Sequence, residues 1–524
     1  WAVAPDSVRP APPAAVPARP GAEPRALVPS SGRAALFVLG AGGAPVRVEA
    51  VRVREEDGAL RRRLACDVLL PEAALLLGTL LLLALAPLLV SRLPDRWAGA
   101  AGLLLVVLTA LAVRAVFLAA YPAPARGGDA WEYLMRSRLL ADGQVPFLES
   151  TRWHAWQTWI RPPGYYLFLA GLRQLPGGWE GWLVWSQALF SAAAAGAVHL
   201  LGRTLFGPTA GLAAGLLFAL SAESVVTVSR VLGEPLYMLF LVPALVALAR
   251  ASLAPSWRWA AAAGALFGIA SYVRSAPLFF VPVAAVLLLW VHGPRRGWRP
   301  AAGLVAALAL AVAPWVARNS ALYGAPVGMD DLSVINLLQV WPDDAVVPTG
   351  GADLDDPGEY RRYYERLKRA NADHALTRRS GEITRRTLLR MARDPVETGR
   401  RFAGNLRGYF GAYEEDWLER SLGEERVCRR ILVTDLINAG TYGLLVLAAA
   451  GLALRFRRRE IWPVVAWFLF NGVVVNLFFH PEPKYRFPTL PVAFVLAGAA
   501  VGWAMSLWTG EGAAREEPPP AAPR

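Results

Sequence analysis

Two acidic residues follow an early apolar part of the chain, in the run GGDAWEY at residues 127–133. A carboxylate at the mouth of a bundle of membrane helices is energetically costly, so it is a candidate functional group. An aspartate just outside a bilayer can also act as a general base on a hydroxyl group. We therefore take Asp129 as the candidate catalytic residue and Glu132 as a candidate second acid.

The same two acids also fit a purely structural role. Residues 130–141 are predicted to form a short helix that Asp142-Gly143 ends. Asp129 would then be the N-cap of this helix and Glu132 its third residue, which is a capping-box arrangement. Both interpretations stay open from the residues alone.

A cluster of cations precedes the last apolar segment, in the run HPEPKYRFP at residues 480–488. Arginine carries nearly all the positive charge of the chain, and Lys484 is one of only two lysines. Lys484 and Arg486, with Tyr485 between them, are expected at a helix start, where cations and free backbone N–H groups suit a phosphate. The alternative is that they anchor this helix to lipid headgroups.

Arg161 and Arg274 are further cations at predicted helix boundaries. Pro162-Pro163 predicts an extended turn before a short helix at 165–172. Arg161 then either lines a cavity together with the neighbouring tyrosines or extends to the headgroups. Arg274 lies between two apolar runs, where an arginine pairs with another group or snorkels.

Four other residues are candidates for lining a cavity: Tyr133, Tyr165, His154 and Glu234. Each also has an ordinary structural interpretation. Glu234 before Pro235 is typical of a helix start, and the tryptophans around His154 are typical of a membrane interface, although they could stack on sugar rings.

No metal site or cofactor is predicted. No pair of histidines has the spacing of metal ligands. Cys66 and Cys428 are far apart and match no ligand spacing, so a disulfide framework is not expected either.

The composition predicts an all-α polytopic membrane protein. Of the 524 residues, 55% are hydrophobic, and apolar runs near the ~20 residues that cross a bilayer recur along the chain. We predict about eleven spans, at residues 71–90, 98–120, 179–202, 208–222, 231–249, 259–273, 276–292, 301–317, 432–454, 461–479 and 488–508.

The distribution of arginines predicts the orientation of these spans. The short loops that would be cytoplasmic hold more arginines than the short loops on the other side, including Arg203, Arg250 and Arg295. Loops 121–178 and 319–430 are then extracytoplasmic. Because arginines in such a protein face headgroups, the net charge of +13 does not indicate a nucleic-acid partner.

We predict six parts of the chain. They are an extracytoplasmic Pro-rich segment with a partial jelly-roll-like β region (1–65), an extra membrane helix (66–94), a membrane module containing the loop 121–178 (95–318), a large loop with amphipathic helices at 359–375 and 383–406 (319–430), C-terminal membrane helices with the loop 480–488 (431–508), and a cytoplasmic tail (509–524). The chain begins at Trp1, so we expect it to be part of something longer.

In this order, the motifs resemble those of the GT-C superfamily of polyprenyl-phosphate-dependent glycosyltransferases. The similarity is greatest to the family-39 type, which includes protein O-mannosyltransferases and lipid A aminoarabinose transferases. It rests on residues 128–133, 161–165, 233–236, 274–277, 314–324 and 484–488. Members often have adjacent acids in the first outer loop, whereas Asp129 and Glu132 are three residues apart, and Lys484 stands where an arginine is common.

The resemblance implies an inverting glycosyltransferase of the plasma (inner) membrane, with its active site on the extracytoplasmic side. Asp129 would act as the base for an acceptor hydroxyl. Lys484, Tyr485 and Arg486 would bind the donor phosphate, assisted by Arg161 and Arg274. The partners would be a polyprenyl-phosphate sugar, membrane lipids and an acceptor that is a protein, a lipid or a glycan.

Three other functions are compatible with the sequence. A transporter or flippase for a polyprenyl-linked saccharide would need charges at mid-membrane and internal symmetry, and we see neither. An O-antigen-ligase-like enzyme would use a lipid diphosphate donor and is poorly distinguished by sequence. A non-catalytic sugar-binding membrane protein is the third alternative.

Overall fold

The computed structural model describes residues 36–39, 45–48, 85–86, 95–125, 130–143, 161–330, 332–351, 357–371, 375–413, 427–478 and 483–508. The chain divides into two compact units, Trp1–Glu72 and Ala73–Arg524. In the first unit, β1 (Leu36–Leu39) and β2 (Pro45–Val48) pair as an antiparallel hairpin in which Leu36 faces Val48. Both strands lie within the segment 1–65, for which the sequence predicted a partial β region.

The second unit is helical. Its elements are α3 (Asp95–Ala120), α4 (Ala130–Ala141), α5 (Gly164–Leu172), α6 (Trp179–Phe206), α7 (Pro208–Leu220), α8 (Ala222–Val226), η3 (Thr227–Ser229), α9 (Glu234–Leu253), α10 (Trp257–Ser271), α11 (Ala276–His292), α12 (Pro294–Tyr323), α13 (Leu332–Val340), α14 (Pro357–Ala370), α15 (Ala375–Arg378), α16 (Ser380–Arg393), α17 (Pro395–Tyr409), α19 (Val427–Arg455), η5 (Arg459–Ile461), α20 (Trp462–Phe478), η6 (Pro483–Thr489) and α21 (Leu490–Trp508).

The all-α polytopic membrane fold is confirmed. Among the described residues, seven helices are long and apolar enough to cross a membrane, or eight if the bent pair 208–220 and 222–229 is one span. The predicted spans from 98–120 onwards each coincide with a helix. The span predicted at 71–90 lies almost entirely outside the described residues, and the count of eleven is not confirmed.

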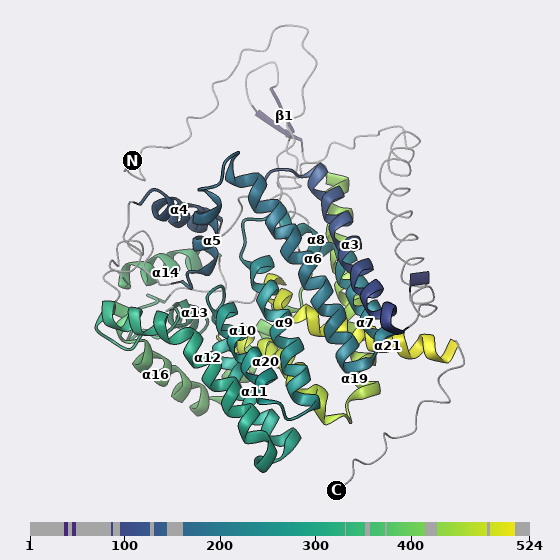
Figure 1. Ribbon diagram of the computed structural model, residues 1–524. Coiled ribbons are helices and arrows are strands. Elements are labelled where there is room, and N and C mark those ends of the chain that lie inside the picture. The colour runs from purple at the N-terminus through teal and green to yellow at the C-terminus, as the bar shows by residue number, and fades with distance from the viewer. Residues whose placement is uncertain are drawn as a thin grey trace. The chain divides into compact units, whose positions relative to one another are not determined.

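Small residues let the central helices pack closely. A β-carbon at Gly264 of α10 would collide with the Leu304 carbonyl of α12, and one at Gly268 would collide with Ala311. Because lipid supplies no hydrophobic drive between helices, such close van der Waals packing holds the bundle together. On the other side of α10 lies α9, which also packs against α6 (Figure 1).

A buried arginine stabilises the bend between α7 and α8. The two helices meet at 54°, which leaves carbonyl groups at the end of α7 without helical partners. Arg114 of α3 donates to the Ala219 carbonyl at 2.8 Å and to the Ser224 hydroxyl at 2.9 Å. A further bond to Ser191 of α6 at 2.9 Å ties three elements to this point.

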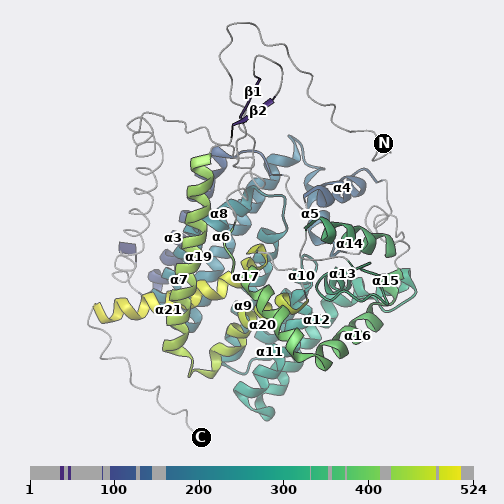
Figure 2. The ribbon, with the colours of Figure 1, turned by 180° about the vertical axis from the view of Figure 1, so that it is seen from behind.

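The predicted large loop forms amphipathic helices that dock on the end of α20. The helix predicted at 383–406 is divided into α16 and α17 at Asp394, whose side chain caps α17 by accepting from the Glu397 N–H at 2.9 Å. Trp341 donates to the Leu477 carbonyl and Asn405 to the Asn476 carbonyl, both at 2.8 Å. Figure 2 shows α17 lying against α20 and α16 beside α13.

Candidate functional site

Two glycines bring three helix ends together. The N–H of Gly164, at the start of α5, donates to the Tyr272 carbonyl at 2.6 Å, and a β-carbon there would lie 2.7 Å from that oxygen. A β-carbon on Gly233, just before α9, would lie 3.0 Å from Val273. Only a residue without a side chain allows both approaches without displacement. The motifs around Arg161, Glu234 and Arg274 therefore meet at one end of the bundle.

A cavity of about 130 Å³ lies where these ends meet; we call it the polar cavity. Its charged and polar lining residues are Tyr133, Arg161, Tyr237, Arg274, Ser275, Asp330, Asn336, Asn471 and Tyr485. They come from α4, α9, α13, α20 and η6 and from the connections between helices. The sequence predicted Tyr133, Arg161, Arg274 and Tyr485 for such a site, and the structure brings these four together.

Each arginine of the polar cavity has a buried carboxylate beside it. Arg161 pairs with Glu132 at 2.7 Å (Nη2 to Oε2), and Arg136 pairs with the other oxygen of Glu132 at 3.1 Å. Arg274 pairs with Glu234. The carboxylates fix the positions of the two guanidinium groups at the cavity.

The pairing keeps Arg274 charged. Burial lowers the pKa of its guanidinium group, but the Glu234 carboxylate more than offsets this effect, so the pKa lies above its ordinary value. Glu132 and Glu234, in turn, are not among the residues that line the cavity. They act through the arginines that they hold, which is a role that sequence spacing alone did not indicate.

Asp330 is a lining residue that the sequence analysis missed. It follows α12, where Asn319 donates to the Gly328 carbonyl at 2.8 Å and the Trp315 indole donates to the Met329 carbonyl at 3.1 Å. These bonds fix the chain just before Asp330. The signal was present in the sequence, since Asp330 comes six residues after the motif at 314–324, but its place at the cavity depends on contacts across the turn.

Tyr237 was also missed. Its ring lines the polar cavity, and its buried hydroxyl has no hydrogen-bond partner among the described residues. A buried donor without a partner is costly, and a ligand that accepts its hydrogen bond would remove that cost.

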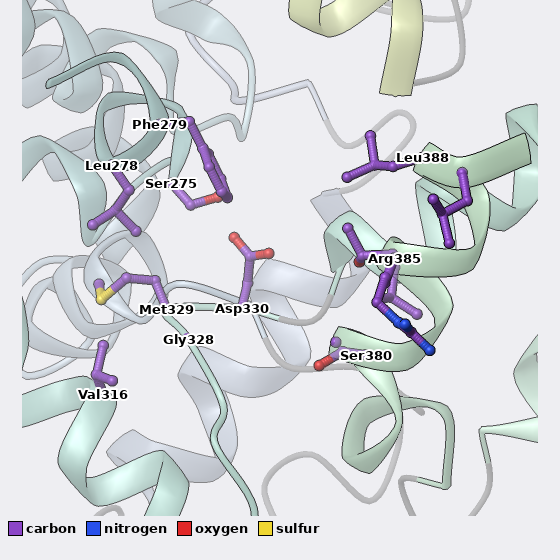
Figure 3. Close-up of a pocket in the computed structure, with 14 residues that line it drawn as sticks. Ser275, Leu278, Phe279, Val316, Gly328, Met329, Asp330, Ser380, Arg385 and Leu388 are labelled. Atoms are coloured by element: carbon purple, nitrogen blue, oxygen red, sulfur yellow. The ribbon is translucent and has the colours of Figure 1, made fainter. Parts of the chain in front are cut away.

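A larger groove of about 720 Å³ adjoins the polar cavity and shares Ser275, Phe279 and Asp330 with it. Its apolar lining includes Leu278, Val316, Met329, Leu388 and Leu389, so we call it the apolar groove. Figure 3 shows Asp330 between Phe279 of α11 and the face of α16 that carries Arg385 and Leu388. Charged and apolar binding surfaces therefore meet at Asp330.

The other predicted site residues lie around the polar cavity or outside the described part. Tyr165 is buried behind it, in an edge-to-face contact with Tyr133, and donates to Gln187 at 3.1 Å. Lys484 lies over the Tyr485 ring. Arg486 is buried, donates to the Gly411 carbonyl and is not among the lining residues. Asp129, which is the N-cap of the predicted capping box, and His154 lie outside the described residues.

Among the described residues, no group of three or more His, Cys, Asp or Glu side chains is arranged to hold a metal ion. The oxygen and nitrogen atoms at the polar cavity belong instead to arginine, asparagine, tyrosine, serine and one aspartate. Such groups bind phosphate and sugar hydroxyls directly.

Part of the chain matches a known family. Residues 160–317 match the dolichyl-phosphate-mannose-protein mannosyltransferase family. The matched segment begins just before Arg161, ends within α12 and contains both cavity arginines. It confirms the predicted resemblance to the GT-C superfamily. No curated protein matches the chain significantly.

Solved structures with partial similarity include the oligosaccharyltransferase of Archaeoglobus fulgidus. The form tethered to an acceptor peptide containing the NVT sequon is 14% identical, with a TM-score of 0.45 over 81% of this chain and 52% of that one. The complex with an inhibitory peptide and a dolichol-phosphate is 13% identical, with a TM-score of 0.46 over 81% and 53%. The chain thus spans about half the length of these structures.

Proposed function

We propose that the protein is an inverting glycosyltransferase that moves a sugar from a polyprenyl-phosphate donor to an acceptor hydroxyl. The observation that carries the proposal is the junction of the two binding surfaces. A polar cavity with two carboxylate-held arginines adjoins an apolar groove, as a ligand with a charged head and an apolar tail requires. The family match over residues 160–317 supports the same class of donor.

The arginines suit the leaving group. In the transfer step the acceptor oxygen attacks the anomeric carbon, and the bond from that carbon to the phosphate oxygen breaks with its electron pair. Arg161 and Arg274 stabilise the negative charge that develops on the phosphate, and Tyr237 and Tyr485 add hydroxyl donors. Lys484, beside Tyr485 in the chain, adds positive charge. Because the departing phosphate is a weak base, the step needs no general acid.

Asp129 takes the proton of the acceptor hydroxyl in this proposal. Attack from the face opposite the phosphate inverts the anomeric carbon. Glu132, whose two oxygens face Arg161 and Arg136, is a support for the cavity and not the base. Asp330, Asn336 and Asn471 line the polar cavity and would bind sugar hydroxyls in this proposal.

The apolar groove holds the first isoprene units of the donor. Its walls come from α11 and α12 on one side and from α16 on the other. Leu388 and Leu389 of α16 are about half exposed, at 45% and 47%, which suits a surface that faces lipid chains.

The active site faces the extracytoplasmic side of the plasma (inner) membrane in this proposal. Arginines gather at the end of the bundle opposite the polar cavity, including Arg250 in the last turn of α9, Arg295 in the first turn of α12 and Arg458 just before η5. The positive-inside rule assigns that end to the cytoplasm. A lipid-borne donor also suits a compartment without nucleotide sugars.

The test is release of polyprenyl phosphate by the purified protein. It is incubated in lipid nanodiscs with polyprenyl-phosphate-linked mannose, glucose, arabinose and aminoarabinose, together with peptide, glycan and lipid acceptors. We expect release from at least one donor, dependent on an acceptor, and loss of release in Arg274→Gln. No release from any of the donors, or full release in Arg274→Gln, would overturn the proposal.

A further inference from the structure

The residues of the short helix η6 lie in two different environments. Tyr485 and Pro488 line the polar cavity, whereas Arg486 and Phe487 are buried and are not among its lining residues. Trp467 of α20 donates to the Pro488 carbonyl at 2.8 Å and fixes the end of η6. The start of η6, which carries Tyr485, must be fixed by other contacts.

Arg486 supplies those contacts. Its side chain is only 2% exposed, its Nη1 donates to the Gly411 carbonyl at 2.8 Å, and its guanidinium group lies 5.0 Å from the centre of the Tyr413 ring. Gly411 and Tyr413 belong to the segment that follows α17, at the end of the large loop. Among the described residues, the Nε and Nη2 atoms of Arg486 have no hydrogen-bond partner.

Tyr413 is itself held from two sides. Its hydroxyl donates to Glu223 of α8 at 2.8 Å. Its N–H donates to the Asn438 side chain of α19 at 2.8 Å, and Asn438 donates back to the Tyr413 carbonyl at 3.1 Å. Burial, reinforced by the nearby Glu223 carboxylate, raises the pKa of Tyr413 well above its ordinary value, so its hydroxyl stays a donor.

The cluster of Glu223, Tyr413 and Arg486 is poorly suited to binding a lipid headgroup and well suited to holding the end of the large loop in place. Glu223, Tyr413 and Arg486 are each at most 6% exposed and come from parts of the chain that are far apart. A buried charge whose partners come from distant parts of the chain is strongly position-dependent, because a shift leaves it without compensation. Movement of the loop end would therefore displace Arg486 and, with it, Tyr485.

We propose that Arg486 is a positioning residue, and that Glu223, Gly411, Tyr413, Asn438 and Arg486 form a latch. The latch holds the end of the large loop against η6 and thereby sets Tyr485 in the polar cavity. The arrangement of the latch does not depend on whether the protein has the proposed enzymatic activity. Its consequence for catalysis rests on the proposed function, because Tyr485 would then hold the donor phosphate only while the latch is closed.

The latch is tested by the reactivity of a thiol introduced with Tyr485→Cys in a Cys66→Ser, Cys428→Ser background. The rate of modification by a small water-soluble maleimide is measured alone and with Arg486→Met or Tyr413→Phe added. We expect either addition to raise the rate by about fivefold or more, as loss of one buried hydrogen bond to a charged group allows. The matched control Arg400→Met alters an exposed arginine of α17 and should change nothing.

A thiol at a second position distinguishes displacement of residue 485 from a general loosening of the polar cavity. Ser275→Cys places a thiol in the same cavity from the connection between α10 and α11. Opening of the latch should raise the rate of maleimide modification at position 485 and leave the rate at position 275 unchanged. Equal rises at both sites, or no rise at 485 with either Arg486→Met or Tyr413→Phe, would overturn the proposal. If Arg486→Met fails to fold, Tyr413→Phe, which removes only one hydroxyl, decides the matter.

The effect of the latch on catalysis is measured separately from the thiol modification rates. If polyprenyl-phosphate release is detected, Tyr413→Phe should raise the KM for the donor about tenfold, with a smaller change in kcat. Failure of the proposed function would leave no activity in the parent protein but would not change the thiol rates. An unchanged KM in a variant with raised thiol reactivity would refute the catalytic consequence of the latch.

Discussion

Replacing Glu132 with glutamine should destabilise the protein strongly. Glu132 is 3% exposed and faces two arginines at 2.7 and 3.1 Å, one of which, Arg136, is 1% exposed. At an effective dielectric constant of about 20, each pair at a charge separation of about 4 Å contributes about 4 kcal/mol before desolvation. Removal of one partner of a buried pair typically costs about 3–5 kcal/mol, and two arginines would be left beside a neutral amide.

The assay is the thermal unfolding midpoint in detergent, followed by intrinsic tryptophan fluorescence. We expect Glu132→Gln to lower it by on the order of 5–10 °C. Adding Arg136→Gln should recover part of this loss, because it removes one uncompensated charge. Glu397→Gln, which breaks an exposed pair in α17, is the control and should cost less than about 1 kcal/mol. A Glu132→Gln protein of unchanged stability that loses only activity would refute this reasoning and identify Glu132 as the base.

Three further predictions concern the packing, the cavity and the groove. Gly264→Val should lower the free energy of unfolding by about 1–3 kcal/mol, since its side chain meets the Leu304 carbonyl, and a melting curve in detergent checks it. Asp330→Asn should lower kcat/KM at least about tenfold with an unchanged melting midpoint, whereas a parallel loss of stability would contradict a role in binding the sugar. Leu389→Glu should raise the KM for a long-chain donor about tenfold but not that for a two-isoprene analogue, and equal effects on both would argue against the apolar groove as the tail site.

Much of the helical bundle could be predicted because local patterns determine it. Apolar runs of membrane length gave the helices from 98–120 onwards. The turn at the end of α4 was visible in Asp142-Gly143, and Gly143 has a φ of 63°, which glycine adopts readily. The division of the predicted helix at 383–406 also had a local signal, Asp394 before Pro395, that the amphipathic pattern on both sides obscured.

The composition of the site depended on contacts between distant residues and was only partly predictable. Arg161 and Arg274 could be recognised as candidates, but their carboxylate partners come from α4 and α9. Arg486 looked equivalent to Lys484 in sequence, yet a contact with Gly411, 75 residues away, turns it from the cavity. One-dimensional spacing cannot tell which side of η6 faces a ligand.

The most direct test of the account is the rate of polyprenyl-phosphate release by Asp129→Asn, compared with Asp142→Asn. Asp142 lies at the other end of α4 in an exposed pair with Arg138, so it is a matched control. We predict that release falls by roughly 10²–10⁴-fold in Asp129→Asn and stays at the parental rate in Asp142→Asn. Parental release by a correctly folded Asp129→Asn protein would contradict the assignment of this residue as the base.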